Sequence, residues 1–331
     1  MTTQNSVSSP TDARKTRRRL NFGFDRFSGL YVFALLVIVF ALWIPNLFLS
    51  VNTARSTLAQ EAITAIIALG LLIPIAAGVF DLSVAGSVSV GAAVALWFQT
   101  NGFPWPLGVI GALVVGVLIG ALNGVVIVNL KVDSFIATLG MSSILVAMRY
   151  WATDGKQVVA GIQPGFIAFG QFKVLTFPLS FFYMLILAAI LYFILEYRPA
   201  GRRLYAVGGN PIATRLAGVR TGRVIRGSLI SSAVIASFAG TLLAAQLGNA
   251  TPDMGAPYLL PAFSAVFLGA TQIRPGRVNV LGTLVAILLL ATGVKGLQLL
   301  GAPTYIPYLF NGLALIVAVA LAVRPTRKTK G

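Results

Sequence analysis

Residues 106–129 read PLGVIGALVVGVLIGALNGVVIVN, an apolar run that contains no charged side chain. About 20 residues of helix cross the roughly 30 Å hydrocarbon layer of a membrane, so this run is long enough to span one. Small residues recur in it every four positions and therefore share one helix face, where a neighbouring backbone can approach closely. These residues are Gly108, Ala112, Gly116, Gly120 and Gly124. We expect a packing seam here, within the subunit in preference to a dimer contact.

Long apolar runs of this kind recur along the rest of the chain. Of the 331 residues 57% are hydrophobic and 10% are charged, whereas about a quarter of a soluble protein is charged. The sequence therefore predicts an all-α integral membrane protein with about ten transmembrane helices. The expected spans are 28–49, 57–79, 83–99, 106–129, 133–151, 177–196, 227–248, 258–272, 279–297 and 304–322. They form one transmembrane domain, 28–322, between polar tails at 1–27 and 323–331.

The positions of Lys and Arg predict the orientation, because basic residues beside a span are retained on the cytoplasmic side. All but five of the 25 basic residues fall in the two tails and in the loops on the same side as the tails. The exceptions are Arg55, Arg149, Lys156, Lys173 and Lys295. Both termini are therefore expected inside, and segment 152–176 outside.

Spans two to five and seven to ten form two groups that start on opposite sides, as in an inverted repeat. The third and eighth spans correspond in that repeat, and they are the shortest and most interrupted. One opens with Asp81-Leu82-Ser83 and the other contains Pro257 and Pro261. Short or broken helices in matching places indicate a transport pathway, although the same residues can simply cap or kink a helix.

Several kinds of chemistry are excluded. With no cysteine and no histidine, the chain has no thiol nucleophile and no thiolate or imidazole metal ligand. The Gly-Lys pair at Gly155 is followed by Gln157 in a loop expected outside, so there is no P-loop, and no G-x-G-x-x-G fingerprint occurs either. The net charge of +17 lies in clusters between apolar runs, which favours membrane topology over nucleic-acid binding. No metal or cofactor is expected in this chain.

The acidic residues offer no proton relay. There are eight, scattered along the sequence, and Glu61 alone lies clearly inside a span, near the outer end of 57–79. A proton-coupled carrier usually needs ionisable groups at mid-membrane depth. The energy source for transport is therefore expected elsewhere.

The loop 197–226 carries the strongest local design. Asn210 can cap a helix whose first residue is Pro211, and Gly218 can end it in a left-handed conformation. The helix near 211–217 would be about 10 Å long and too short to be stable alone. Its Ile212 and Leu216 share a face, so it is suited to a groove in a partner. A positive loop that only fixes topology would explain the arginines but not this helix.

These residues carry a resemblance. GRRLYAVGGNPIATRLAGV at 201–219 resembles the coupling-helix segment of permease subunits in the ribose/xylose/arabinose/galactose-type ABC importers. GVFDLSV at 78–84, NGVVIVNLKVDSFIATLG at 123–140 and LPAFSAVFLGATQIRPGRVNVLGT at 260–283 resemble family segments in the same order. Two departures stand out: Ala85 replaces a usual glycine, and Asp133 replaces a common proline.

The resemblance implies a permease of the bacterial plasma (inner) membrane, dimeric with a second copy or a paralogue. It implies a cytoplasmic ATP-binding subunit, of tandem-domain type, that holds ATP and Mg, and an external sugar-binding protein. Contacts to the ATPase would come from Gly201, Arg202, Asn210, Pro211, Ile212, Ala213, Leu216, Ala217 and Gly218.

A pathway for a neutral monosaccharide or related polyol would be lined by hydroxyl, amide and aromatic groups. The candidates are Asp81, Ser83, Ser87, Asn123, Phe263, Ser264 and Asn311, each of which can instead serve packing or interhelical hydrogen bonds. An ATP-independent carrier or facilitator with the same repeat is the alternative. A membrane-embedded enzyme has no nucleophile, base or metal cluster to support it.

Overall fold

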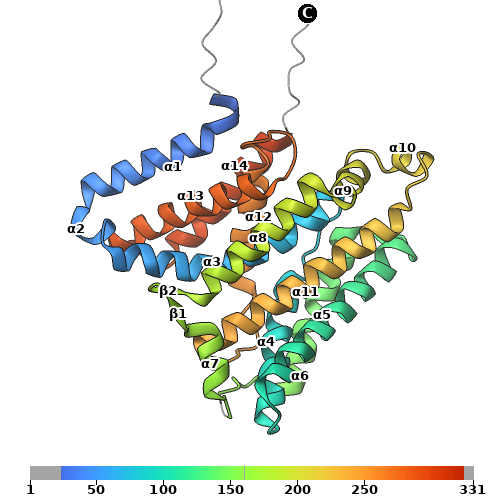
Figure 1. Cartoon of the computed structure of the whole chain (residues 1–331), viewed down its shortest axis with the longest axis horizontal. Coiled ribbons are helices and arrows are strands. Elements are labelled where there is room, and N and C mark those ends of the chain that lie inside the picture. Colours follow the sequence, from blue (N-terminus) through green and yellow to red (C-terminus); the bar gives the residue numbers. More distant parts are fainter. Residues whose placement is uncertain (1–23, 160, 324–331) are drawn as a thin grey trace, which may run out of the picture.

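The computed structural model describes residues 24–159 and 161–323, and within them the protein is an almost entirely helical bundle (Figure 1). The basic cluster of the expected N-terminal tail, 1–27, lies outside the described residues, as does most of the expected tail 323–331. In the part of the chain that the structure describes, six helices are long and apolar enough to cross a membrane. They are α3 (Val51–Ala76), α5 (Trp105–Val128), α6 (Ser134–Thr153), α8 (Leu179–Tyr197), α11 (Thr221–Leu247) and α13 (Val280–Leu299).

Four apolar helices are shorter in their apolar part: α1 (Phe24–Trp43), α4 (Val84–Thr100), α12 (Ala256–Gly269) and α14 (Ile306–Val323). Each of the ten expected apolar segments thus falls on a helix, and the all-helical membrane fold is confirmed at that level. The remaining elements are α2 (Pro45–Phe48), α7 (Pro164–Gln171), α9 (Pro199–Gly209), α10 (Pro211–Leu216) and the paired strands β1 (Lys173–Val174) and β2 (Phe177–Pro178).

Several helix boundaries differ from the expected ones, and two of these differences have a clear local cause. The first expected span breaks at Pro45, which begins α2, because proline has no amide hydrogen to continue a helix. The expected span 57–79 starts six residues earlier, at Val51, because the hydroxyl of Ser50 caps it by accepting from the Thr53 amide at 3.1 Å. Glu61 consequently lies well inside α3 and not near its end.

The small-residue seam of α5 packs within the subunit, as expected. A Cβ on Gly108 would lie 2.5 Å from the carbonyl oxygen of Ala95 in α4, and one on Gly120 would lie 2.4 Å from the Cα of Ile230 in α11. Such distances leave room for hydrogen alone, so the three helices approach backbone to backbone. The seam thus fixes the position of α11, whose other face packs on α3.

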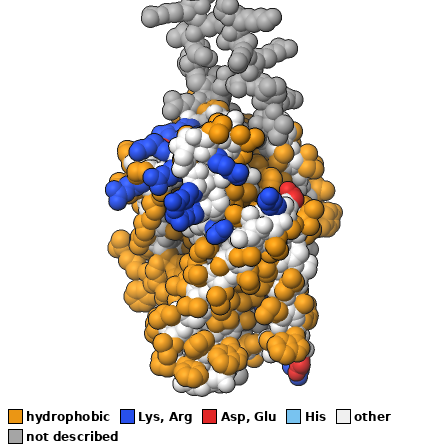
Figure 2. Space-filling model, turned by 90° about the vertical axis from the view of Figure 1, so that its right-hand side faces the viewer, with side chains coloured by type: hydrophobic (Ala, Val, Ile, Leu, Met, Phe, Trp, Pro, Cys, Tyr) orange, Lys and Arg blue, Asp and Glu red, His pale blue; other side chains and the backbone are white. Residues whose placement is uncertain are grey.

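Apolar side chains cover the flanks of the bundle (Figure 2). Leu118, Ile144, Ile186 and Ile316 are each more than half exposed. Exposing so much apolar surface to water would be unfavourable, whereas the hydrocarbon of a bilayer would cover it. Figure 2 also shows Lys and Arg side chains gathered at one end of the bundle, and we call this end, where α9 and α10 lie, the α9–α10 end.

Candidate functional site

The expected helix in the loop 197–226 is α10, and its ends are built as the sequence predicts. The Asn210 side chain accepts from the Ala213 amide at 3.0 Å, and Pro211 is the first helical residue. Gly218 has φ +84°, a left-handed conformation that glycine adopts without strain. The helix ends at Leu216, one residue earlier than expected.

The apolar face of α10 points away from the bundle. Ile212 is 74% exposed and Leu216 is 85% exposed. Arg202, Ala213 and Ala217 are exposed as well. Thr214, on the opposite face, is buried and donates its hydroxyl to the carbonyl of Ala206 at 2.8 Å, which fastens α10 to α9. The helix therefore presents an apolar pair that no described residue covers.

Helix α9 was not expected from the sequence, and it forms the base on which α10 lies. It begins at Pro199 just beyond α8, and it packs against both α8 and α3. Two glycines allow these contacts. A Cβ on Gly201 would lie 2.3 Å from the Leu195 carbonyl oxygen, and one on Gly208 would lie 2.2 Å from the Ala76 carbonyl oxygen. Gly201 is thus buried against α8 and does not face outward with the other coupling candidates.

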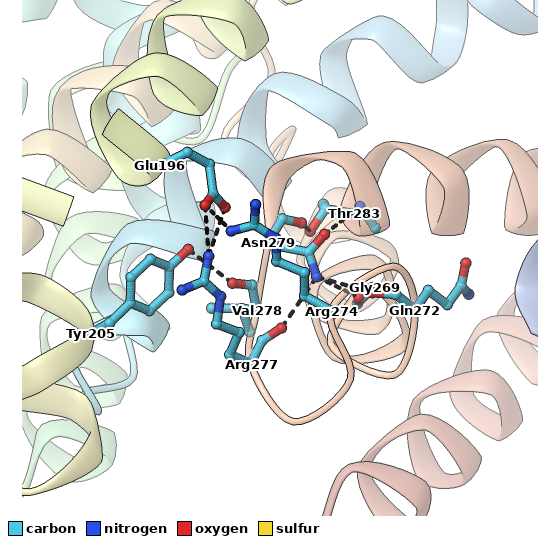
Figure 3. A network of polar contacts seen from close by, with 10 residues as sticks. Glu196, Tyr205, Gly269, Gln272, Arg274, Arg277, Val278, Asn279 and Thr283 are labelled. Carbon is cyan, nitrogen blue, oxygen red and sulfur yellow. Dashed lines mark hydrogen bonds and ion pairs between the residues drawn. The ribbon is translucent and has the colours of Figure 1, made fainter. Parts of the chain in front are cut away.

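A charged network ties α8 and α9 to the loop between α12 and α13 (Figure 3). Glu196 accepts hydrogen bonds from Arg274 and from Arg277, the latter at 2.7 and 2.8 Å. The Glu196 side chain is 9% exposed, while both arginines are more than one-third exposed. We call this contact the Glu196 clasp. Local sequence gives no signal for it, because Arg274 and Arg277 lie 78 and 81 residues beyond Glu196.

Tyr205 of α9 reinforces the clasp. Its hydroxyl donates to the carbonyl of Val278 at 3.0 Å, and the Arg277 guanidinium lies 4.2 Å from its ring centroid (Figure 3). Burial raises the pKa of the Tyr205 phenol, and the nearby Arg277 opposes part of that shift. The hydroxyl therefore stays protonated and remains a donor.

Asn279 gives the loop a fixed shape. Its side-chain amide donates to the carbonyls of Gly269, Gln272 and Arg277, and its side-chain oxygen accepts from the Gly282 amide at 2.8 Å, which caps α13. Figure 3 shows these bonds converging on one side chain. The loop that the Glu196 clasp grips is thus itself joined to the end of α12 and to the start of α13.

The pathway candidates divide into two groups. In the first group, between α4 and α5, Asp81 accepts from the amide and hydroxyl of Ser83 at 3.1 and 2.6 Å, and Asn123 donates to the Ser83 hydroxyl at 2.8 Å. These three residues and Ser87 are fully buried. They tie the turn before α4 to α5, which is a structural use of the residues.

The second group lies around α12. The Ser264 hydroxyl donates to the carbonyls of Leu260 and Asn311, and Phe263 stacks on Phe267 with 6.2 Å between centroids. Asn311 lines two adjoining cavities, of about 160 and 530 Å³. Both cavities are also lined by Pro257 and Pro261, the prolines of the expected broken helix.

Glu61 is a candidate that the sequence reasoning missed. It lines the smaller cavity together with Thr64, Tyr258 and Asn311. The expected span 57–79 puts Glu61 near a helix end, whereas ten residues of α3 precede it. The first group of candidates lines none of the cavities around α12, so the structure does not bring all seven candidates together.

Comparisons with known proteins agree on a family. The sequence profile described as "Branched-chain amino acid transport system / permease component" matches residues 53–319. The chain is 30% identical over 305 residues to the ribose import permease protein RbsC of Haemophilus influenzae, covering 90% of this chain and 94% of that one. It is 32% identical over 296 residues to RbsC of Bacillus subtilis, covering 89% and 91%.

The galactose/methyl galactoside import permease protein MglC of Escherichia coli is 30% identical over 311 residues, covering 88% of this chain and 93% of that one. No solved structure matches the chain.

Proposed function

The chain belongs to the family of branched-chain amino acid transport system permease components, and on that premise we propose that it is the membrane subunit of an ATP-binding-cassette importer for a monosaccharide. It is a multi-pass protein of the bacterial plasma membrane, as its sequence predicts. The family's description mentions amino acids, but the relatives quoted above are permeases for ribose and galactose. Sequence identity of 30–32% to these sugar permeases, extending over about nine-tenths of the chain, supports a sugar or related polyol as the solute.

In the proposed topology all ten apolar helices cross the membrane, with both termini and the α9–α10 end in the cytoplasm. Helices α3 to α6 and α11 to α14 are then the two halves of an inverted repeat. The correspondence pairs α4 with α12, and these have 17 and 14 residues. Shortened helices in matching places support a pathway beside them.

One observation carries the proposal: a capped helix holds Ile212 and Leu216 exposed at the end where basic side chains gather. Fully burying an apolar side chain is worth about 1.5–3 kcal/mol, so the pair favours insertion of α10 into a groove of a partner. We propose that this partner is a separate cytoplasmic ATPase, of tandem-domain type, which holds ATP and Mg. The coupling loop 197–226 would then be the part of the membrane domain that contacts it.

The contacts of α9 suggest how closure of the ATPase reaches the membrane. Movement of α10 passes through Thr214 to α9, and from α9 to the end of α3 at Gly208 and to the α12–α13 loop at Tyr205. The Glu196 clasp makes α8 part of the same unit. The cavities beside α12 are where such a movement would change access for the solute. An external sugar-binding protein would deliver the solute, and a second copy or a paralogue would complete the pathway.

A reconstitution tests the function. The chain is placed in liposomes with the ATPase and binding protein encoded by neighbouring genes, and uptake of labelled ribose and galactose is measured. The expected result is uptake that requires ATP, the binding protein and the ATPase. Uptake or counterflow by the chain alone, without ATP, would overturn the proposal.

That second outcome would favour an ATP-independent carrier or facilitator. The observation that keeps this alternative in view is Glu61, an ionisable group that lines the smaller cavity. In a proton-coupled carrier, Glu61→Gln would abolish the response of uptake to a pH gradient. In the ATP-driven importer, no such response exists to be lost.

A further inference from the structure

A groove lies between α8 and α11 at the α9–α10 end. Both helices pack against α3, and Figure 1 shows them running alongside each other. The groove has a volume of about 350 Å³. Ile73 of α3 lies at its floor, and apolar side chains of α8, α9 and α11 form its walls. These side chains are Leu191, Ile194, Leu195, Leu204 and Val224.

Towards the opposite end of the bundle the same space is closed by aromatic rings. The ring centroids of Tyr183 in α8 and Phe238 in α11 lie 5.8 Å apart. Phe169 of α7 contacts both rings, at 5.3 and 6.3 Å. The groove is therefore a slot that is closed towards α7 and is bordered by α9 at its other end.

The two hydroxyl groups in the slot do not make it polar. Ser228 donates to the carbonyl of Ile225 at 2.7 Å, and Ser231 donates to the carbonyl of Gly227 at 2.8 Å. Each serine thus satisfies its own donor within α11. On α8, the neighbouring Ile190 and Phe193 are about half exposed, so the slot adjoins the apolar surface that faces the bilayer.

Two arginines line the end of the slot that α9 borders, Arg203 of α9 and Arg223 in the first turn of α11. Within the described part of the chain neither forms an ion pair, while Glu196 is engaged by Arg274 and Arg277. Guanidinium groups bind phosphate oxygens in a bidentate manner. The complement of this site is an anionic head joined to a long apolar chain.

We propose that the slot binds an anionic phospholipid, with one acyl chain between α8 and α11 and the phosphate held by Arg203 and Arg223. Basic pockets between membrane helices recognise such headgroups. The proposal depends on the chain spanning a membrane and not on the solute it carries.

The test is lipid binding by the purified full-length protein. Native mass spectrometry follows the titration of phosphatidylglycerol into delipidated protein, with phosphatidylcholine and inorganic phosphate as the comparison ligands. We expect one tightly held phosphatidylglycerol, weak binding of phosphatidylcholine and no thermal stabilisation by phosphate alone. Equal binding of both lipids, or the same stabilisation by phosphate as by phosphatidylglycerol, would overturn the proposal.

Three variants locate the site. Arg203→Gln with Arg223→Gln should weaken phosphatidylglycerol binding by about 25-fold, since each basic residue near an anionic headgroup is worth about a factor of five. Lys131→Gln with Arg220→Gln removes the same charge from the same end, outside the slot, and should leave binding unchanged. Equal losses in the two double variants would mean that charge acts without a site, and the proposal would fall.

The third variant fills the slot without changing charge. Gly227 lines the slot, and a Cβ there meets no atom within 4 Å, so the side chain of Gly227→Phe starts in open space and would extend into the space for the acyl chain. It should reduce phosphatidylglycerol binding while the thermal unfolding of the lipid-free protein is preserved. Unchanged lipid binding in a folded Gly227→Phe protein would contradict the slot as the site. None of these readouts involves transport, so they are independent of the proposed function.

Discussion

The carboxylate of Glu196, at the end of α8, lies 2.7 Å from the guanidinium of Arg277, 81 residues further along the chain. This contact joins the helices that carry α10 to the loop that ends α12. The two residues are too far apart in the sequence for a local pattern to reveal the contact. It belongs to the series of contacts that runs from the exposed apolar pair of α10 to the α12–α13 loop. Its removal should therefore separate ATP hydrolysis from solute movement.

Glu196→Gln should lower the amount of sugar taken up per ATP hydrolysed while the ATPase still binds. Removing the charge leaves two arginines without a carboxylate partner and loosens the grip on the α12–α13 loop. Coupling free energies are about 1–3 kcal/mol, so we expect roughly a tenfold loss in the ratio. Uptake and hydrolysis measured in the same proteoliposomes check this, with Lys131→Gln as the control. An unchanged ratio of uptake to hydrolysis would show that the Glu196 clasp does not couple ATP hydrolysis to sugar movement.

Ile212→Asp and Leu216→Asp should abolish binding of the ATPase without unfolding the chain. Both side chains are exposed, so the free subunit loses little, whereas the complex would have to bury a carboxylate. We expect the dissociation constant to rise by well over a factor of ten. Co-purification and thermal unfolding measure the two effects, and Ile212→Leu should bind normally. Full binding by the Asp variants would remove α10 from the interface.

Gly218→Val should fray the end of α10 and uncouple transport. The residue sits at φ +84°, where a β-branched side chain is strained by about 1–2 kcal/mol. Hydrogen exchange should speed up across α10 and remain unchanged in α5. Bulky replacements of Ala213 should also reduce coupling, but by obstructing the partner and with exchange unaltered. A Gly218→Val protein with normal exchange and normal uptake would contradict both expectations.

Gly120→Leu should destabilise the bundle, whereas Gly140→Leu should not. A Cβ on Gly120 would lie 2.4 Å from the backbone of Ile230, while one on Gly140 meets no atom within 4 Å. Overpacking costs about 1–3 kcal/mol. The melting temperature in detergent should therefore fall by several degrees in the first variant only. Equal melting temperatures would mean that α5 and α11 separate easily.

Glu61→Gln should leave ATP-driven uptake largely intact and change its pH dependence little. Glutamine keeps the size and hydrogen-bonding capacity of the side chain beside Thr64 and Tyr258. A neutral sugar needs no charge in the cavity, so uptake rates of the two proteins should agree within about twofold at pH 6 and pH 8. A loss of more than tenfold would show that the carboxylate itself takes part in transport.

Sequence reasoning placed the ten apolar helices and the caps of α10 because these depend on local chemistry. An apolar run determines the structure of its own residues, and the Asn210-Pro211 pair determines that of the few residues that follow it. The seam of α5 was also predictable, since small residues every four positions leave few packing alternatives. What was missed depends on distant contacts: α9 needs Gly208 against the end of α3, and Glu196 needs a loop 81 residues away. Glu61 was misplaced because the cap at Ser50 extends α3.

The exposed pair on α10 also has a consequence for the cell that makes the protein. If α10 binds an ATPase as proposed, a subunit synthesised in excess of that partner displays Ile212 and Leu216 to water, and exposed apolar side chains of this kind favour self-association. The two side chains would then mark every unassembled copy. Synthesis of the permease and its partner in matched amounts would keep these side chains covered. Two residues on a six-residue helix would thus make the stability of the permease in the cell depend on the supply of its partner.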